Sequence, residues 1–219
     1  MKAQLPQKTQ RELIPTGNYP ARIYEIIEIG TVDGTWMGEA KKTHKVRIGF
    51  ELPTEKRVFD EKKGEQPMVV SKEMALSFGD LAGLRKIIEA VEGRKITDAE
   101  AVDYEVESIM GKPLLVTVSH SEPNEQGIIY ANATTFSPLI KGLTVEPLNN
   151  KPKYLEYAKW DENVYNSLPD FLKEKLSSTP EYKSMRNGNK PDVQVGGYDG
   201  ALNGGLSNGE VKNTDDIPF

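Results

Sequence analysis

Residues 43–52 read Thr-His-Lys-Val-Arg-Ile-Gly-Phe-Glu-Leu, and this stretch decides the fold class. Apolar and polar side chains alternate along it. One face would carry His44, Val46, Ile48, Phe50 and Leu52, and the other Lys45, Arg47, Gly49 and Glu51. A period of two residues predicts a strand with one buried face and one exposed face. We therefore expect the cations of the polar face to point outward.

Further strands are expected on both sides of this stretch. Residues 19–32 alternate in the same way, apart from Ile26, and the following Asp33-Gly34 is typical of a hairpin turn. Pro53 is expected to end or bend the strand of residues 43–52. Residues 56–59 and 68–76 would continue the sheet on the two sides of a charged loop, residues 60–66.

The period then changes to that of a helix. Apolar residues recur at positions 81, 84, 87, 88 and 91, and Gly93 follows as a helix stop. Thr97 and Glu100 have the spacing of a capping box, so a second short helix is expected from there to about Met110. Residues 114–120 and 128–136 predict two more strands.

This order of three strands, a helical insertion and two strands is typical of an OB-fold, a five-stranded Greek-key barrel. Another small β-barrel or an α+β sandwich would fit the same order. We expect a mostly-β chain with an N-terminal arm (1–18), an OB-fold domain (19–145) and a helical or loop extension packed on the barrel (146–185). Residues 186–213 would be a flexible linker, because residues 186–209 contain seven glycines and only isolated apolar side chains.

The composition excludes several kinds of site. The chain has 219 residues and no cysteine, which excludes a disulfide framework, a cysteine-ligated metal and a thiol nucleophile. Two histidines leave little material for histidine-based metal binding or catalysis. No apolar run approaches the ~20 residues that span a bilayer, and residues 1–10 lack the apolar core of a signal peptide. We expect a soluble cytoplasmic protein with no membrane partner, no cofactor, no metal and no enzymatic activity.

The charge is distributed unevenly along the chain. The net charge is −5, but residues 36–72 hold nine basic and six acidic residues, whereas residues 89–125 hold three basic and nine acidic ones. A local field, rather than the net charge, steers a polyanion toward a surface. One side of the molecule is therefore expected to accept phosphate and another to repel it.

The sequence ends in Asp215-Asp216-Ile217-Pro218-Phe219, behind the glycine-rich stretch. This ending resembles the acidic tip of bacterial and bacteriophage single-stranded DNA-binding proteins. The resemblance implies that Phe219 and Ile217 fill apolar slots on replication, recombination or repair enzymes, while Asp215 and Asp216 meet basic residues around them. Pro218 would restrict the preceding residue. Thr214 stands where the family often has another acidic residue, which would weaken this contact. The long extension departs from the small cellular form, so a monomer or dimer is expected rather than a tetramer.

An OB-fold grips a single strand with a basic groove and with rings on which bases stack. The expected groove combines cations and rings from the strands and from the first inter-strand loop, where Trp36 would lie unless it plugs the core. The candidates are Arg22, Tyr24, Trp36, Lys41, Lys42, Lys45, Arg47, Arg57, Phe59 and Tyr130. Tyr130 is either a stacking platform or a core residue.

Two other functions fit parts of the sequence. A β-barrel adaptor could use the tip to capture the partners of host single-stranded DNA-binding proteins without binding DNA. A metal-dependent nuclease could use paired carboxylates among Asp98, Glu100, Asp103, Glu105 and Glu107, although a solvated helix face explains this cluster better.

Overall fold

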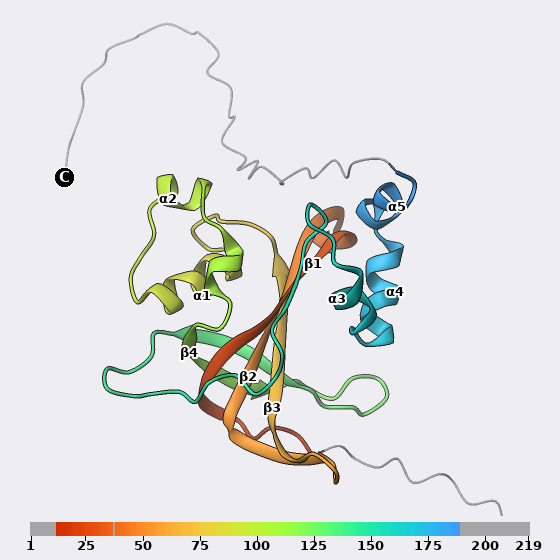
Figure 1. Ribbon diagram of the computed structural model, residues 1–219. Helices are drawn as coiled ribbons and strands as arrows, with labels where there is room; N and C mark the ends of the chain where they lie inside the picture. The colour runs from red at the N-terminus through yellow and green to blue at the C-terminus, as the bar shows by residue number, and fades with distance from the viewer. Residues whose placement is uncertain (1–11, 37, 189–219) are drawn as a thin grey trace, which may run out of the picture.

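A computed structural model describes residues 12–188 except residue 37, and the side chain of Trp36 lies outside the description. The fold is mostly β. Its strands are β1 (Gly17–Trp36), β2 (Glu39–Asp60), β3 (Gly64–Ala75), β4 (Pro113–His120), β5 (Ala131–Ser137) and β6 (Lys153–Leu155). They form one six-stranded sheet in the order β3-β2-β1-β4-β5, with β6 on β1 (Figure 1). All pairings are antiparallel except that of β6 with β1.

The first two strands are longer than the sequence predicts. The expected turn at Asp33-Gly34 is wrong, because both residues belong to β1 and pair with Lys42 and Lys41. Trp36 therefore ends β1 instead of lying in a loop. Pro53 does not end β2 either. The strand continues to Asp60, and the pairing with β3 is irregular between Leu52 and Lys56. An irregularity of this kind absorbs a residue that cannot donate to the ladder.

Two bulges in β1 divide its apolar side chains between two cores. The pairing with β2 skips Tyr24 and Ile29. After each of these extra residues, side chains that would have pointed to one face of the sheet point to the other. Ile26 consequently joins Ile23 in the main core, whereas Ile27 and Ile29 lie in a second core on the other face. The predicted alternation treats Ile26 as an exception because it assumes a strand without bulges. With the bulge at Tyr24 included, Ile26 faces the main core like Ile23.

The connection between β3 and β4 is helical. Helix α1 (Gly83–Glu92) buries Leu84, Ile87 and Ile88 in the main core and ends at Gly93, whose φ of 68° confirms the predicted stop. Helix α2 (Asp98–Val102) begins with the predicted capping box of Thr97 and Glu100. The expected continuation to Met110 is wrong. A separate 3₁₀ turn, η1 (Val106–Ile109), follows after Asp103 has ended α2.

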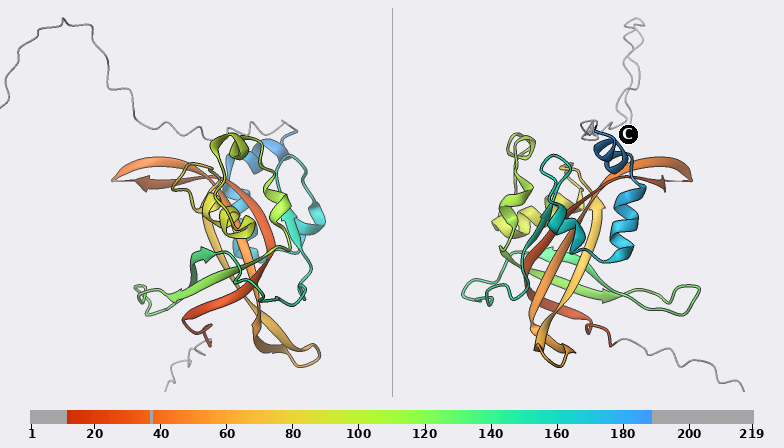
Figure 2. Two further views of the ribbon diagram at one scale, coloured as in Figure 1. Left: turned by 90° about the vertical axis from the view of Figure 1, so that its left-hand side faces the viewer. Right: turned by 45° about the vertical axis from the view of Figure 1, so that its right-hand side comes forward.

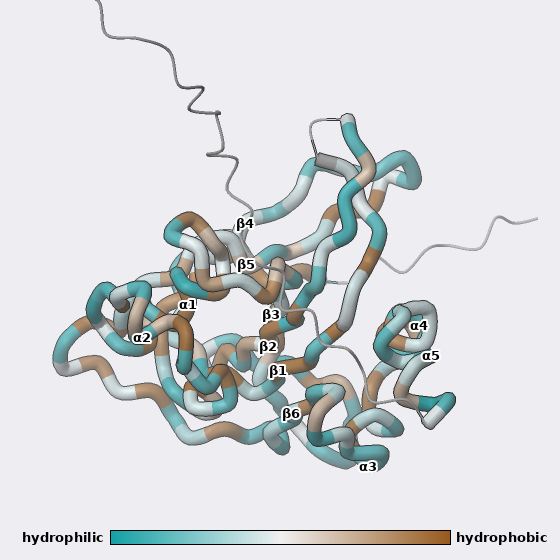
Figure 3. The backbone as a smooth tube through the Cα atoms, turned by 90° about the horizontal axis from the view of Figure 1, so that it is seen from above, coloured by the Kyte–Doolittle hydropathy of each residue, from teal (hydrophilic) through white to brown (hydrophobic). Residues whose placement is uncertain are grey.

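Three helices cover the opposite side of the β1–β2–β3 strands from α1 and α2 (Figures 1 and 2). They are α3 (Glu162–Asn166), α4 (Asp170–Ser178) and α5 (Pro180–Arg186). Leu172 and Leu176 of α4, and Leu168 between α3 and α4, are buried against Ile27 and Ile29. Seen from above, the sheet stands between the two helical groups (Figure 3). Within the described residues, no helix is long and apolar enough to cross a membrane.

Candidate nucleic-acid interface

The predicted cations of the β1–β2 hairpin lie at its free end. Lys41 and Lys42 are exposed there, close to the end of β1 at Trp36, and each pairs across the ladder with the backbone of a β1 residue. Lys45 is half-buried further along β2, between Gly30 of β1 and Ala75 of β3. Two exposed ammonium groups at one hairpin end are suited to phosphate contacts.

Arg47 is already engaged by the rest of the protein. Its Nε donates to Glu25 Oε1 at 3.0 Å, its Nη1 lies 3.7 Å from Glu73 Oε1, and its guanidinium carbon lies 5.7 Å from the centroid of the Phe171 ring. Lys175 of α4 also contacts Glu73. The extension therefore covers the polar face of β2 at this point, and Arg47 is occupied by carboxylates and a ring.

Arg22 and Tyr24 also have internal roles. The Arg22 guanidinium donates to three backbone carbonyls, those of Gly111, Val145 and Glu146, at 2.6–2.8 Å. It thereby holds the segment after β5 against β1. The Tyr24 ring packs over Gly49, so closely that a Cβ at Gly49 would lie 2.8 Å from the ring. Burial raises the pKa of Tyr24, with a further contribution from Glu25. Both side chains therefore make their described contacts within the protein.

The remaining predicted residues lie elsewhere. Arg57 and Phe59 are near the β2–β3 turn, at the opposite end of β2 from Lys41 and Lys42. Arg57 donates to the Glu12 carbonyl at 3.3 Å, and Phe59 is 59% exposed. Tyr130 precedes β5 and is 51% exposed, so it is not a core residue. The nine predicted residues whose side chains are described therefore lie at both ends and on one covered face of the hairpins, and not in one groove.

A groove that the sequence analysis missed lies along α1, between β3 and β5. We call it the α1 groove. Its volume is about 620 Å³, and its walls carry four cations and one carboxylate together with apolar and hydroxyl side chains. The lining residues are Lys72, Met74, Gly83, Lys86, Glu89, Ala90, Gly93, Arg94, Lys95, Thr134, Thr135, Phe136 and Pro138. The helical period of the sequence places Lys86 on the outward face of α1. No local sequence pattern indicates that β5 lies beside β3, so the groove itself could not be predicted.

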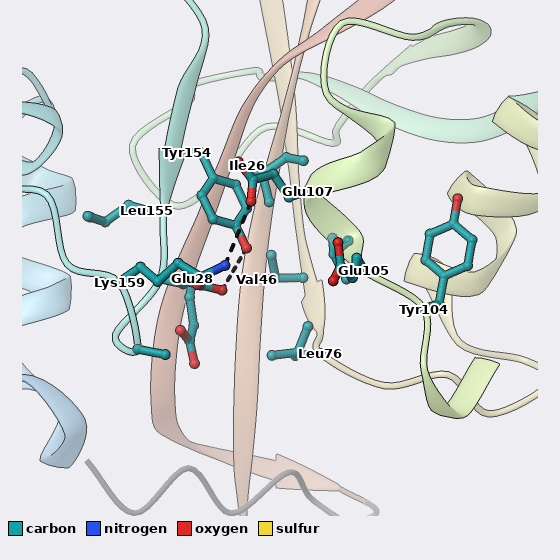
Figure 4. A pocket seen from close by; sticks show the side chains of 13 residues that line it. Ile26, Glu28, Val46, Leu76, Tyr104, Glu105, Glu107, Tyr154, Leu155 and Lys159 are labelled. Atoms are coloured by element: carbon teal, nitrogen blue, oxygen red, sulfur yellow. Dashed lines mark hydrogen bonds and ion pairs between the residues drawn. The ribbon is translucent and has the colours of Figure 1, made fainter. Parts of the chain in front are cut away.

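The other notable pocket is acidic. It lies between β1, η1 and the segment after β6, has a volume of about 290 Å³, and is lined by Glu28, Glu105, Glu107 and Glu156 (Figure 4). Lys159 lies 3.3 Å from Glu156 and 4.0 Å from Glu107. Because carboxylates outnumber cations on its wall, this pocket repels a phosphate. The acidic pocket and the α1 groove are distinct, but they do not follow the charged segments of the sequence. Two cations of the groove, Arg94 and Lys95, come from the acidic stretch of residues 89–125.

The carboxylates considered for a nuclease do not share a helix face. Asp98 contacts Arg85 at 2.7 Å, and Glu100 contacts Arg94 at 2.8 Å. The end of α2 at Val102 separates both from Glu107, which lines the acidic pocket. Hydrogen bonds from Arg94 and Thr97 lower the pKa of Glu100 to about 2. Within the described part of the chain, no three His, Asp or Glu residues are placed to hold a metal ion.

His44 joins the sheet to the extension. Its Nε2 lies 2.8 Å from Glu28 Oε1 and its Nδ1 lies 3.4 Å from Glu181 Oε1 of α5. Glu181 also accepts hydrogen bonds from the Thr31 hydroxyl and, at 2.9 Å, from the Thr31 backbone N–H. Burial alone would lower the pKa of His44, but the two carboxylates raise it above its usual value. The network is structural, and it fixes α5 to β1.

The predicted partner-binding residues, Asp215, Asp216, Ile217, Pro218 and Phe219, lie outside the described residues, as does most of the predicted linker. Comparison with known proteins adds no assignment. No protein-family model matches the chain, and no curated protein is significantly similar to it.

Proposed function

We propose that this protein is a single-stranded DNA-binding protein built on an OB-fold, and that it recruits DNA-processing enzymes through residues 214–219. The strand order supports this proposal most. The order β3-β2-β1-β4-β5, with its helical connection between β3 and β4, is the order of an OB-fold opened between its third and fifth strands. Helix α1 packs on both edge strands at that opening.

The charge distribution favours a polyanionic ligand on particular surfaces. Lys41 and Lys42 are exposed at one hairpin end, and the α1 groove carries an excess of cations. The acidic pocket occupies a different surface. A protein of net charge −5 can bind a polynucleotide if its cations are gathered in this way, because screening limits repulsion from distant carboxylates to about 10 Å at 0.1 M salt.

The second part of the proposal concerns Asp215, Asp216 and Phe219. An acidic sequence with terminal apolar side chains is suited to a partner pocket that combines an apolar slot with Arg or Lys. Carried on a tether, such a motif acts at a high effective concentration on enzymes at the same DNA. Replication, recombination and repair enzymes are the expected class of partner.

A titration of fluorescently labelled oligo-dT tests the DNA-binding part. We expect binding that weakens steeply with salt, needs no magnesium and leaves the oligonucleotide intact. The double variant K41A/K42A should reduce the slope of log K against log salt by roughly 1.4, if both lysines contact phosphates. The control is K151A/K183A, which removes two exposed lysines that belong to neither strand of the hairpin.

The full-length chain at low salt provides the decisive result. Absence of oligo-dT binding would contradict the proposal. If the chain then still captured a partner through residues 214–219, it would be an adaptor, and magnesium-dependent loss of the oligonucleotide would indicate a nuclease.

A further inference from the structure

The α1 groove is long enough to hold an extended ligand. It runs from Gly83 at the start of α1 to Gly93 at its end, and a ten-residue helix is about 15 Å long. One wall is β3 and the other is β5. The groove is therefore a channel along the helix, not a spherical cavity for a single ion.

The charges in the α1 groove are not balanced. Its carboxylate, Glu89, already lies 2.6 Å from Lys95 Nζ and 3.6 Å from Arg85 Nε, and it accepts the Ile96 N–H. Arg94 is paired with Glu100. Within the described residues, the side chains of Lys72 and Lys86 make no ion pair or hydrogen bond. Two ammonium groups thus line the groove without a compensating anion.

Lys72 has an unusual position for a lysine. It pairs with the fully buried Ile48 and follows Val70 by two residues, so its side chain projects from the core-facing side of β3. It is only half-exposed. A half-buried cation is costly without a partner, so the position favours an anionic ligand over bulk water.

The edges of the sheet add hydrogen-bonding groups. Within the described residues, β3 is hydrogen-bonded to no strand but β2, and β5 to none but β4, although β3 and β5 lie side by side. Both edges border the α1 groove and offer backbone N–H and C=O groups. Thr135 adds a hydroxyl, while Met74, Phe136 and Pro138 supply an apolar wall. The Thr134 hydroxyl also lines the groove but donates to the Thr117 carbonyl.

We propose that the α1 groove binds a segment of single-stranded polynucleotide, with phosphates at Lys72 and Lys86 and a base against Phe136. This inference rests on the proposed function and assigns to it a second path, distinct from the end of the β1–β2 hairpin. Inorganic phosphate would use the cations alone. A nucleotide uses the cations, the Thr135 hydroxyl and the apolar wall together, and this combination selects the ligand class.

Salt titration of K72A/K86A with labelled oligo-dT tests the site. If each lysine contacts one phosphate, the salt slope should fall by roughly 1.4, which corresponds to about 25-fold weaker binding at 0.1 M salt. K151A/K183A should keep the slope of the unmodified protein. A circular dichroism spectrum and an unchanged thermal midpoint would establish that K72A/K86A is folded.

Lysine footprinting locates the contact independently of the variants. Acetylation of the full-length protein, followed by mass spectrometry, should show Lys72 and Lys86 protected by oligo-dT and Lys151 modified as in the free protein. Binding of oligo-dT without protection of Lys72 and Lys86, and with an unchanged slope in K72A/K86A, would overturn this inference and leave the proposed function standing. No binding at all would refute the proposed function. Protection by a peptide of residues 210–219, but not by oligo-dT, would assign the groove to an acidic peptide and refute the inference.

Discussion

Gly30 is placed where β1 meets α5, and no other residue fits there without strain. Its φ is +94°, and a Cβ would lie 2.7 Å from Glu181 Oε2. Gly142 has a similar φ of +88° but open space around it. We expect G142A to cost about 1–3 kcal/mol from backbone strain alone. G30A should cost more, because it also displaces Glu181 from Thr31. Urea unfolding of both variants measures the difference, and equal losses would show that the Glu181 contact contributes nothing.

His44 should make stability depend on pH. Because Glu28 and Glu181 raise its pKa in the folded protein, the stabilisation by protonated His44 is fully present below the unfolded value of about 6.5. It is lost as pH rises through the raised folded pKa. The free energy of unfolding should therefore fall from pH 6 toward pH 9 in the wild type. The H44Q variant should be nearly flat over this range, and a parallel fall in both proteins would assign the dependence to another group.

At the scale of the elements, the sequence predicts whether a segment is a helix or a strand better than it predicts where that helix or strand ends. The helical stripe and Gly93 predict α1, and the capping box predicts the start of α2, because these signals lie within a few residues. The end of β1 and the faces of its side chains depend on cross-strand pairing and on bulges at Tyr24 and Ile29, which have no local signature. Tertiary pairing therefore overrides the turn preference of Asp33-Gly34.

The extension is expected to contribute to global stability through α4. Leu176 is fully buried in the second core, whereas Phe171 of the same helix is 56% exposed and lies over Arg47. We expect L176A to lower the free energy of unfolding by about 2–5 kcal/mol. F171A should cost no more than about 1 kcal/mol, the range of an exposed cation–π contact. Chemical denaturation distinguishes the two, and similar losses would contradict the burial pattern.

At the scale of the whole molecule, the sequence predicts a separation of charge but not the surfaces that carry it. Arg22 and Arg47 look like outward cations in the sequence, yet distant carbonyls and carboxylates occupy them. Lys72 and Lys86 look unremarkable, yet β5 and α1 place them in one groove. Such long-range contacts cannot be derived from residue spacing.

This charge separation predicts an effect of removing residues 214–219. If the protein binds single-stranded DNA as proposed, the deletion should remove two carboxylates, Asp215 and Asp216, that would compete with DNA for the cationic surfaces. Affinity for oligo-dT should rise at low salt and converge with that of the full chain at high salt, where screening is strong. A variant carrying D215N/D216N should reproduce the gain. Unchanged affinity at low salt would refute the competition.

Arg186, the last residue of α5, joins this helix to the rest of the extension. Its guanidinium carbon lies 5.0 Å from the centroid of the Tyr182 ring and 5.8 Å from those of Trp160 and Tyr165, and its Nη2 lies 2.9 Å from the Glu162 carboxylate. These contacts attach the last turn of α5 to α3 and to the Trp160 ring. Near the other end of α5, Glu181 accepts hydrogen bonds from Thr31 of the central strand β1. Helix α5 is therefore attached to the rest of the protein at both of its ends, to the sheet through Glu181 and to the neighbouring helix through Arg186.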